Sequence, residues 1–488
     1  MEEIIIMGEV NIISEENEKQ GTYLWQLQYT HFDNPAVLVG TPLIRRLRSV
    51  DIEGYVSKTS VESGDSIDFM VSMFPAGNFK IDIYRMGFYN GAGGRHMASL
   101  GSHKAETQDV PLMGMERIRE CRWEKSATFK IPNDWPSGVY LGKLTRDEEF
   151  GCQSYVIFVV KQKRKADILV QVSDLTWQSY NKWPSNDSLY QDGTTDPYYT
   201  GSREASKDNA TVRVSFDRPY AKYQQVMDVP QSIGSGEFLL WEYPLVYWLE
   251  EYGYDVKYCS NVDIHEDPSI LDSAKIFISS GHDEYWSYKM FEEVKKARDN
   301  GLSIAFLSGN SVGWDIEFYD SNVTGEESRG FSRKRHMPNE DQLMGVKTYG
   351  PGYGDWVVTE PNHWVYEDTK MASGDRIEGI IGFEHHGTPA DIPGLEIVAE
   401  SPLYGCQKER LSLGPHTDEP VHHGVIYPGG QGGWVFNAGS VWWNEGLSAP
   451  PGHIPARTPH CGGTLGVDAR VQKITSNVLN RMIIDSNR

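Results

Sequence analysis

The segment Ile276-Phe277-Ile278-Ser279-Ser280-Gly281-His282-Asp283-Glu284-Tyr285-Trp286 joins an apolar run to a polar turn. The apolar run predicts a buried strand, and the helical pattern that follows places residues 280–286 on a strand-to-helix turn. Open α/β sheets bind their ligands at such turns, beyond the carboxyl ends of their strands. A histidine, two carboxylates and two aromatic side chains in five positions therefore predict a functional site.

Strand and helix patterns alternate on both sides of this turn. Alternation of this kind predicts a mostly parallel sheet with helices on both faces, formed by residues 163–488. A stretch at about 320–400 is rich in Gly, Pro and aromatic residues, and we expect it to form a β-rich insertion over the site. The strand patterns lie at 166–172, 255–259, 275–279, 302–307 and 433–438, and the helical patterns at 237–252, 288–300 and 467–484.

Residues 49–162 have a different pattern. Short segments alternate apolar and polar residues and are separated by Gly, Asp and Pro turns, without a helical run between them. This predicts an antiparallel β-sandwich. The basic run at 161–165 is the expected linker, and residues 1–48, which show no period, are expected to form an arm. The predicted fold class is thus multidomain, all-β followed by α/β.

Composition excludes several classes of protein. The 488 residues are 39% hydrophobic, so the chain can bury a large core, and 46 Lys and Arg against 68 Asp and Glu give a net charge of −22. Such a charge disfavours nucleic acid as a partner. No apolar run approaches the roughly 20 residues of a membrane span, and the first residues lack the basic region of a secretory signal. Five cysteines without a CxxC spacing indicate reduced thiols, so we expect a soluble, cytoplasmic protein.

Several chemistries fit the turn poorly. The turn contains no cysteine, and the chain has no G-x-S-x-G motif, which argues against a covalent mechanism. Ser311 follows a strand but has no base beside it in the sequence. His282 and Glu284 can point the same way and hold a metal, although their spacing is not the helical H-E-x-x-H of zinc proteases. A purely structural alternative also stays open, in which the carboxylate caps the turn and the histidine stabilises it through a hydrogen bond.

Further motifs follow a fixed order along the chain. The set resembles the large (β) subunit of N,N-dimethylformamidase and its relatives, from about Val50 to the carboxyl terminus. Two motifs of the predicted sandwich, Ile52-Glu53-Gly54-Tyr55 and Tyr84-Arg85-Met86-Gly87-Phe88-Tyr89, belong to the resemblance. The other motifs are Trp177-Gln178-Ser179-Tyr180-Asn181, Arg218-Pro219-Tyr220, the turn at 280–286, Ser308-Gly309-Asn310, Gly382-Phe383-Glu384 and Phe436-Asn437-Ala438-Gly439-Ser440-Val441-Trp442-Trp443.

The resemblance implies a mononuclear ferric ion, Fe(III), on a glutamine-amidotransferase-like domain. Its ligands would be Tyr180, Tyr220 and Glu284, with Tyr285 as the rival for the second phenolate. Two phenolates and a carboxylate carry three negative charges, which match a ferric ion. The motifs also assign His282 and Asn310 to positions beside the metal, and Glu384 to an acidic position near the substrate.

We therefore expect an iron-dependent amidohydrolase of a small, non-peptide amide, in which the metal polarises the carbonyl and activates the attacking water. His282 would donate a hydrogen bond to a ligand or to the oxyanion, and Glu384 would carry a proton to the leaving amine. The family enzyme works with a small subunit. The sequence leaves open whether this chain needs one and whether it forms homo-oligomers.

Two other functions stay open from the sequence. One is a zinc or other divalent-metal hydrolase that uses His282 and Glu284. The other is a non-catalytic protein that binds carbohydrate or peptide in aromatic clefts. Its candidate residues are Trp177, Trp183, Trp364, Trp442 and Trp443.

Overall fold

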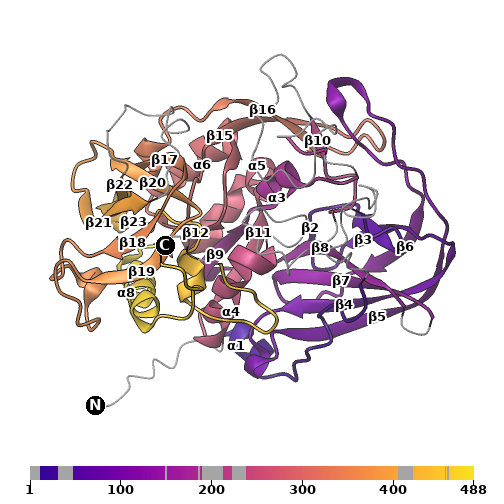
Figure 1. Ribbon diagram of the computed structural model, residues 1–488, viewed down its shortest axis with the longest axis horizontal. Helices are drawn as coiled ribbons and strands as arrows, with labels where there is room; N and C mark the ends of the chain where they lie inside the picture. Colours follow the sequence, from indigo (N-terminus) through magenta and orange to yellow (C-terminus); the bar gives the residue numbers. More distant parts are fainter. Residues whose placement is uncertain are drawn as a thin grey trace.

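The computed structural model describes residues 11–30, 48–148, 151–184, 187–189, 213–221, 238–404, 421–456, 458 and 461–488. In this part of the chain the protein is a mixed α/β structure with many strands and few helices (Figure 1). This confirms the predicted mixture of β and α/β structure. Residues 1–10 and 31–47 of the predicted arm, and Cys406, lie outside the described residues.

Two sheets near the amino terminus, drawn in indigo and purple in Figure 1, share one core. Their strand orders are β1-β3-β6 and β2-β8-β7-β4-β5. Phe69, Ile81 and Phe158, from three different strands, meet in the buried cluster between the sheets. The period-two pattern of these segments places alternate side chains there. The strands are β1 Glu53–Val56, β2 Ser60–Glu62, β3 Ser66–Ser72, β4 Gly77–Met86, β5 Gly94–Ala105, β6 Lys125–Lys130, β7 Gly138–Arg146 and β8 Gln153–Lys161.

The central sheet has nine strands in the order β11-β9-β12-β14-β23-β22-β21-β18-β19. Neighbours from β11 to β23 are parallel, and those from β23 to β19 are antiparallel. The sheet is therefore mixed, whereas the sequence predicted a mostly parallel one. The strands are β9 Ala166–Val172, β11 Val256–Ser260, β12 Ala274–Gly281, β14 Ser303–Ser308, β18 Tyr353–Val357, β19 Arg376–Ile381, β21 Glu396–Tyr404, β22 Val421–Pro428 and β23 Trp434–Asn437.

Helices cover both faces of this sheet. Ile278 of β12 packs in the cluster that contains residues of α4 (Tyr243–Glu251) and α8 (Ala469–Asp485). Its neighbour Phe277 packs in the cluster that contains residues of α5 (Asn261–Glu266) and α6 (Tyr288–Asp299). Alternate side chains of one strand thus enter two different cores, which explains the continuous apolar run at this strand.

The segment at 320–400 is more than a covering insertion, because three of its strands belong to the central sheet. The segment also contributes β16 to a four-stranded sheet with the order β10-β16-β15-β13, and it contains both strands of the pair β17-β20. A strand that adds antiparallel to a sheet edge needs only a short connection, so no helical pattern separates these strands. Their bounds are β10 Val214–Ser215, β13 Tyr285–Ser287, β15 Trp314–Tyr319, β16 Gly330–His336, β17 Val346–Pro351 and β20 Glu384–Pro389.

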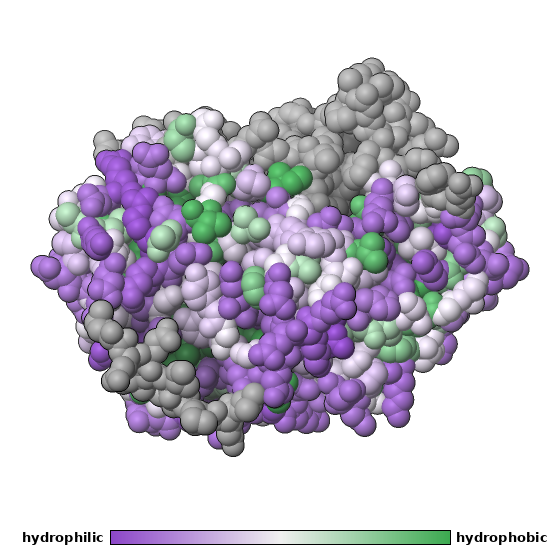
Figure 2. Space-filling view, turned by 90° about the horizontal axis from the view of Figure 1, so that it is seen from below, coloured by the Kyte–Doolittle hydropathy of each residue, from purple (hydrophilic) through white to green (hydrophobic). Residues whose placement is uncertain are grey.

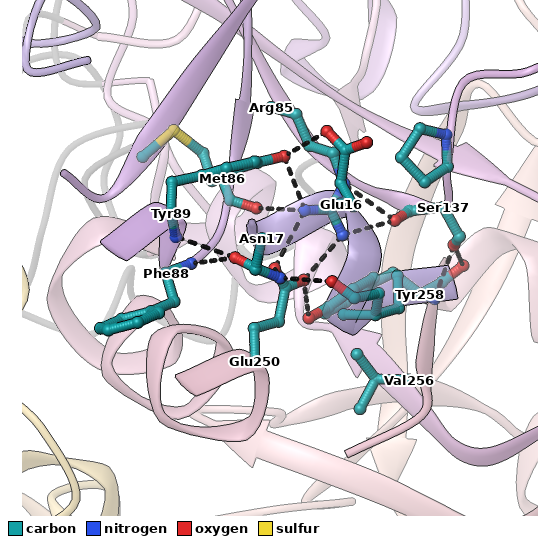
Figure 3. Close-up of polar contacts among 12 residues, drawn as sticks. Glu16, Asn17, Arg85, Met86, Phe88, Tyr89, Ser137, Glu250, Val256 and Tyr258 are labelled. Carbon is teal, nitrogen blue, oxygen red and sulfur yellow. Dashed lines mark hydrogen bonds and ion pairs between the residues drawn. The ribbon is translucent and has the colours of Figure 1, made fainter. Parts of the chain in front are cut away.

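A buried polar network joins the sandwich to the central sheet (Figure 3). Arg85 of β4 donates to both carboxylate oxygens of Glu250 in α4, at 2.9 and 2.7 Å. Tyr258 of β11 donates to Glu250 at 2.9 Å, and Asn17 of helix α1 (Ile12–Asn17) donates at 2.8 Å. Burial lowers the pKa of Arg85, but Glu250 outweighs it and holds that pKa well above its usual value. The described part of the arm therefore helps to fix the two halves of the molecule to each other.

The face shown in Figure 2 is mostly hydrophilic, with scattered apolar residues. No helix in the described ranges is long and apolar enough to span a membrane. Cys121, Cys152, Cys259 and Cys461 form no disulfide within the part of the chain that the structure describes. The likeness to glutamine amidotransferases and the predicted domain boundaries stay predictions.

Candidate active site

The turn after β12 begins at Gly281, which has a φ of +66°. A side chain is strained in this left-handed conformation. A Cβ here would also lie 3.2 Å from the backbone oxygen of Trp241. Glycine thus lets the chain reverse against Trp241 before it presents His282 and Glu284.

Asp283 stabilises the turn through buried hydrogen bonds. Its carboxylate accepts hydrogen bonds from Gln171 at 2.7 Å, Ser279 at 2.8 Å and Asn261 at 2.9 Å. Burial raises its pKa to about 6, and these hydrogen bonds oppose the rise. Of the two carboxylates of the turn, Asp283 therefore has a structural role, and Glu284 is the one available for chemistry.

Three predicted residues meet in a buried group that we call the acid–histidine cluster: His282, Glu284 and Glu384. Nε2 of His282 lies 2.7 Å from Oε2 of Glu384 and 3.4 Å from Oε2 of Glu284. One ligand atom from each residue lies within 4.8 Å of the others. The structure thus brings Glu384, at the start of β20, to the end of β12.

Tyr180 and Asn310 complete this group. Tyr180, the last residue of α3 (Asp174–Tyr180), donates from Oη to Oε2 of Glu284 at 2.8 Å. Asn310 donates from Nδ2 to Oε2 of Glu384 at 2.8 Å, and its own Oδ1 accepts from Thr348 at 3.0 Å. Five of the six predicted site residues therefore form one connected set.

The environment of Glu284 favours a positive partner. Burial raises its pKa, His282 lowers it and Glu384 raises it, so the net direction is upward. Two carboxylates beside one imidazole in a buried space carry an excess of negative potential. A shared proton or a metal cation would relieve this excess.

An aromatic wall, formed by Trp241 and Phe383, lies beside the cluster. The two rings stack with centroids 6.1 Å apart, and the His282 ring packs edge-on against both. Trp241 belongs to a π-helical turn, Phe238–Glu242, and such turns recur at functional sites. The sequence pattern predicted one regular helix over 237–252, with Trp241 on it. The change from π-helical to α-helical geometry after Glu242 is visible only in the structure.

Tyr220 has a different setting. It is half-buried and lines two small cavities, both also lined by Gly54. Burial raises its pKa above the usual value, and the nearby Asp174 carboxylate adds to the rise. The charged groups with the largest effects on this pKa are Asp174, Arg218, Arg329 and Glu242, which lie outside the acid–histidine cluster. The assignment of Tyr220 as a metal ligand therefore stays a prediction.

Tyr285, the rival ligand, is fully buried and packs edge-on against the Tyr180 ring at 6.4 Å. Arg218, from the same motif as Tyr220, donates to Gln178 at 2.8 Å and to the carbonyl of Trp183 at 2.9 Å. These bonds tie the motif at 218–220 to the helix that carries Tyr180.

Comparison with known proteins gives one family. The family model described as "N,N-dimethylformamidase beta subunit-like, C-terminal" matches residues 80–459. The N,N-dimethylformamidase beta subunit of Alcaligenes sp is 21% identical over 365 residues, which cover 68% of this chain and 44% of that protein. The chain thus spans less than half the length of this relative.

Solved structures contribute little. A β-glucosidase from Listeria innocua, solved alone and with isofagomine or glucose, is 11% identical with a TM-score of 0.14, over 22% of this chain and 16% of its own. That likeness is too slight to carry an argument. The family match, by contrast, covers most of the chain and every residue of the acid–histidine cluster, and it confirms the resemblance found in the sequence. The protein belongs to the family of N,N-dimethylformamidase beta subunit-like proteins.

Proposed function

We propose that this protein hydrolyses a small amide at the acid–histidine cluster. The observation that carries the proposal is the convergence of His282, Glu284 and Glu384 from distant parts of the sequence, beside an aromatic wall. The name of the Alcaligenes relative supports an amide substrate. N,N-dimethylformamide is one candidate among small amides.

We propose further that the site holds a mononuclear ferric ion. Oη of Tyr180 and Oε2 of Glu284 lie 2.8 Å apart in a buried, negatively charged environment, so this donor set fits a hard cation. Tyr220 is the proposed third ligand. When bound, such an ion would polarise the amide carbonyl and make a water molecule more acidic.

Glu384 is the proposed proton carrier. It takes a proton from the attacking water as the water oxygen bonds to the carbonyl carbon, and gives that proton to the nitrogen when the C–N bond breaks. The products are a carboxylic acid and an amine. His282 and Asn310 both contact Oε2 of Glu384, so they hold this carboxylate toward the cluster.

The aromatic wall would bind the alkyl groups of the amide. Trp241 and Phe383 are buried rings directly beside His282, so they would contact only a small group enclosed in the site. Each methyl or methylene group buried there would stabilise the complex by about 0.8 kcal/mol. N-alkylated amides are therefore expected to be better substrates than unsubstituted amides.

The test is an amine-release assay with a series of formamides and acetamides, on protein as purified and after treatment with an iron chelator. Release of amine that is lost with the metal and restored by ferric iron supports the proposal. If chelator-treated protein contains no metal and still hydrolyses amides at the original rate, the metal has no part in the reaction.

Zinc is a second candidate metal, because His282, Glu284 and Glu384 supply three ligand atoms of the kinds that zinc accepts. Elemental analysis separates iron from zinc. The aromatic-cleft alternative has less support, since four of its five candidate rings, Trp177, Trp183, Trp442 and Trp443, are at most 3% exposed, and the fifth, Trp364, is partly buried against the core. Such buried rings lack the wide exposed surface that a carbohydrate or peptide needs. A second subunit, which the relative's name as a beta subunit suggests, stays a proposal for this chain.

A further inference from the structure

The two oxygens of Glu284 have different partners. Oε2 accepts from Tyr180 and faces His282, whereas Oε1 accepts a hydrogen bond from Nε1 of Trp314 at 2.9 Å. Trp314 is the first residue of β15 and did not stand out in the sequence. Indole has one N–H and no acceptor, so its ring nitrogen can only donate to the carboxylate.

Trp314 is itself held on several sides. Its backbone N–H donates to the backbone oxygen of Glu284 at 3.0 Å, and β15 pairs with β13 at Tyr285. The ring of His336 stacks on the indole with centroids 3.9 Å apart, and the guanidinium carbon of Arg333 lies 4.8 Å from the ring centroid. Both residues belong to β16, the other neighbour of β15.

This clamp limits the rotation of the Glu284 carboxylate. The terminal torsion of a free glutamate is broad and two-fold, so its oxygens exchange places easily. Here the indole is fixed by its own backbone, by a stacked ring and by a cation over its face. Rotation of the carboxylate plane away from this orientation would break the bonds to Trp314 and Tyr180 together.

We propose that Trp314 is a positioning residue that reserves Oε1 of Glu284 and leaves Oε2 as the single oxygen presented to the cluster. Glu284 then acts through one oxygen, and a metal ion at the site would meet a monodentate carboxylate. The consequence for metal binding and catalysis rests on the proposed function, but the orientation of the carboxylate does not.

The test uses Trp314→Phe in the full chain, because phenylalanine keeps an aromatic ring for His336 and Arg333 but lacks the N–H. Trp434→Phe is the matched control, since Trp434 donates from Nε1 to a carboxylate oxygen of Asp485, also at 2.9 Å, on the last helix. Thermal unfolding of both variants shows whether either substitution disturbs the fold.

Crystal structures of the metal-free wild type and Trp314→Phe test the orientation directly. We expect one carboxylate orientation in the wild type, and a rotated or divided one in the variant. An unchanged Glu284 in the variant would overturn the proposal, whether or not the protein is an amidase. If Trp314→Phe does not fold, benzothienylalanine at position 314 keeps the shape of the indole without the N–H and replaces it in every measurement.

Metal titration and kinetics test the consequence. We expect Trp314→Phe to weaken ferric-ion affinity, or to lower kcat for the amide, by about 10- to 100-fold, the range typical of residues that orient a metal ligand. The KM of Trp314→Phe should stay close to that of the wild type. The ferric-ion affinity and kcat of Trp434→Phe should also change little. Unchanged metal affinity and kcat in a variant whose carboxylate has rotated would refute the functional part. A wild type that binds no metal and cleaves no amide would refute the proposed function instead.

Discussion

Oε2 of Glu384 lies 2.7 Å from Nε2 of His282. This contact joins the first residue of β20 to the turn after β12, so two segments far apart in the sequence share one buried polar site. Because Asn310 donates a hydrogen bond to that same oxygen, Oε2 of Glu384 is contacted from two sides, and neither contact is made to Oε1. A carboxylate fixed in this way suits repeated proton transfer at one place.

Glu384→Gln tests that role. Glutamine has nearly the same shape but cannot take up and release a proton, so kcat for amide hydrolysis is expected to fall by about 100-fold or more. Metal content should stay near that of the wild type, and steady-state kinetics with elemental analysis measure both. Glu378→Gln, which changes an exposed glutamate of β19, is the control. Equal kcat in the two variants would exclude Glu384 as the proton carrier.

Tyr180→Phe tests the proposed phenolate ligand. The substitution removes only the hydroxyl that donates to Glu284, so the fold should persist while iron is lost or its visible absorption band shifts. Tyr366→Phe, which removes a buried hydroxyl bonded to the carbonyl of Val398, is the matched control. A Tyr180→Phe protein with the iron content and spectrum of the wild type would show that Tyr180 is not a ligand.

Arg85→Met tests the network that joins the sandwich to the central sheet. It leaves Glu250 as an uncompensated buried charge, and we expect the free energy of unfolding to fall by about 3–5 kcal/mol. The double variant Arg85→Met/Glu250→Leu removes both charges and should recover a large part of that loss. Urea unfolding of the three proteins measures the difference. A double variant less stable than Arg85→Met would contradict this explanation.

His386 gives a prediction about pH. Its Nε2 accepts from the backbone N–H of Ser311 at 2.9 Å, and its Nδ1 lies 2.8 Å from Oδ1 of Asn437. Burial lowers its pKa to about 4 from 6.5, and the bond to Asn437 opposes this. Between these pH values the unfolded chain binds more protons than the folded one, so stability is present above about pH 6.5 and is lost as the pH falls toward 4.

His386→Gln removes this titration but keeps an acceptor for Ser311. Unfolding free energies at pH 7, 6 and 5 should therefore fall less steeply in the variant, by up to about 1.4 kcal/mol per pH unit. His385 and His422, whose pKa values are lowered mainly by burial, remain in both proteins, although loss of His386 removes one lesser cause that lowers each of them. Parallel pH profiles for the variant and the wild type would show that His386 does not titrate in this way.

Long periodic segments were predicted well from the sequence. The helix expected at 288–300 is α6, Tyr288–Asp299, and the one expected at 467–484 is α8, Ala469–Asp485. The strand before the decisive turn is β12. Such elements bury one face against the sheet, and this burial leaves a regular apolar pattern.

Short elements and long-range pairings could not be predicted in the same way. Three residues, Tyr285–Ser287, form β13 where the end of a turn was expected, and they are too few to show a period. The antiparallel half of the central sheet depends on which strands find each other across the fold, which no local pattern records. The arm contains helix α1, whose six residues are likewise too few for a periodic signal.

The site divides along similar lines. His282 and Glu284 stand out in the sequence because polar residues follow a buried strand. Glu384 and Asn310 were expected only through family resemblance, since nothing local connects them to the turn. Trp314 contacts Glu284 only because β13 and β15 pair, so its role appears first in three dimensions.

The most direct test of the central claim is elemental analysis of the purified protein, combined with its visible absorption spectrum. We expect stoichiometric iron and a phenolate-to-iron charge-transfer band, both lost in a Glu284→Gln variant that still folds. A colourless, metal-free protein that takes up no added ferric iron and still hydrolyses small amides would contradict the proposed ferric site.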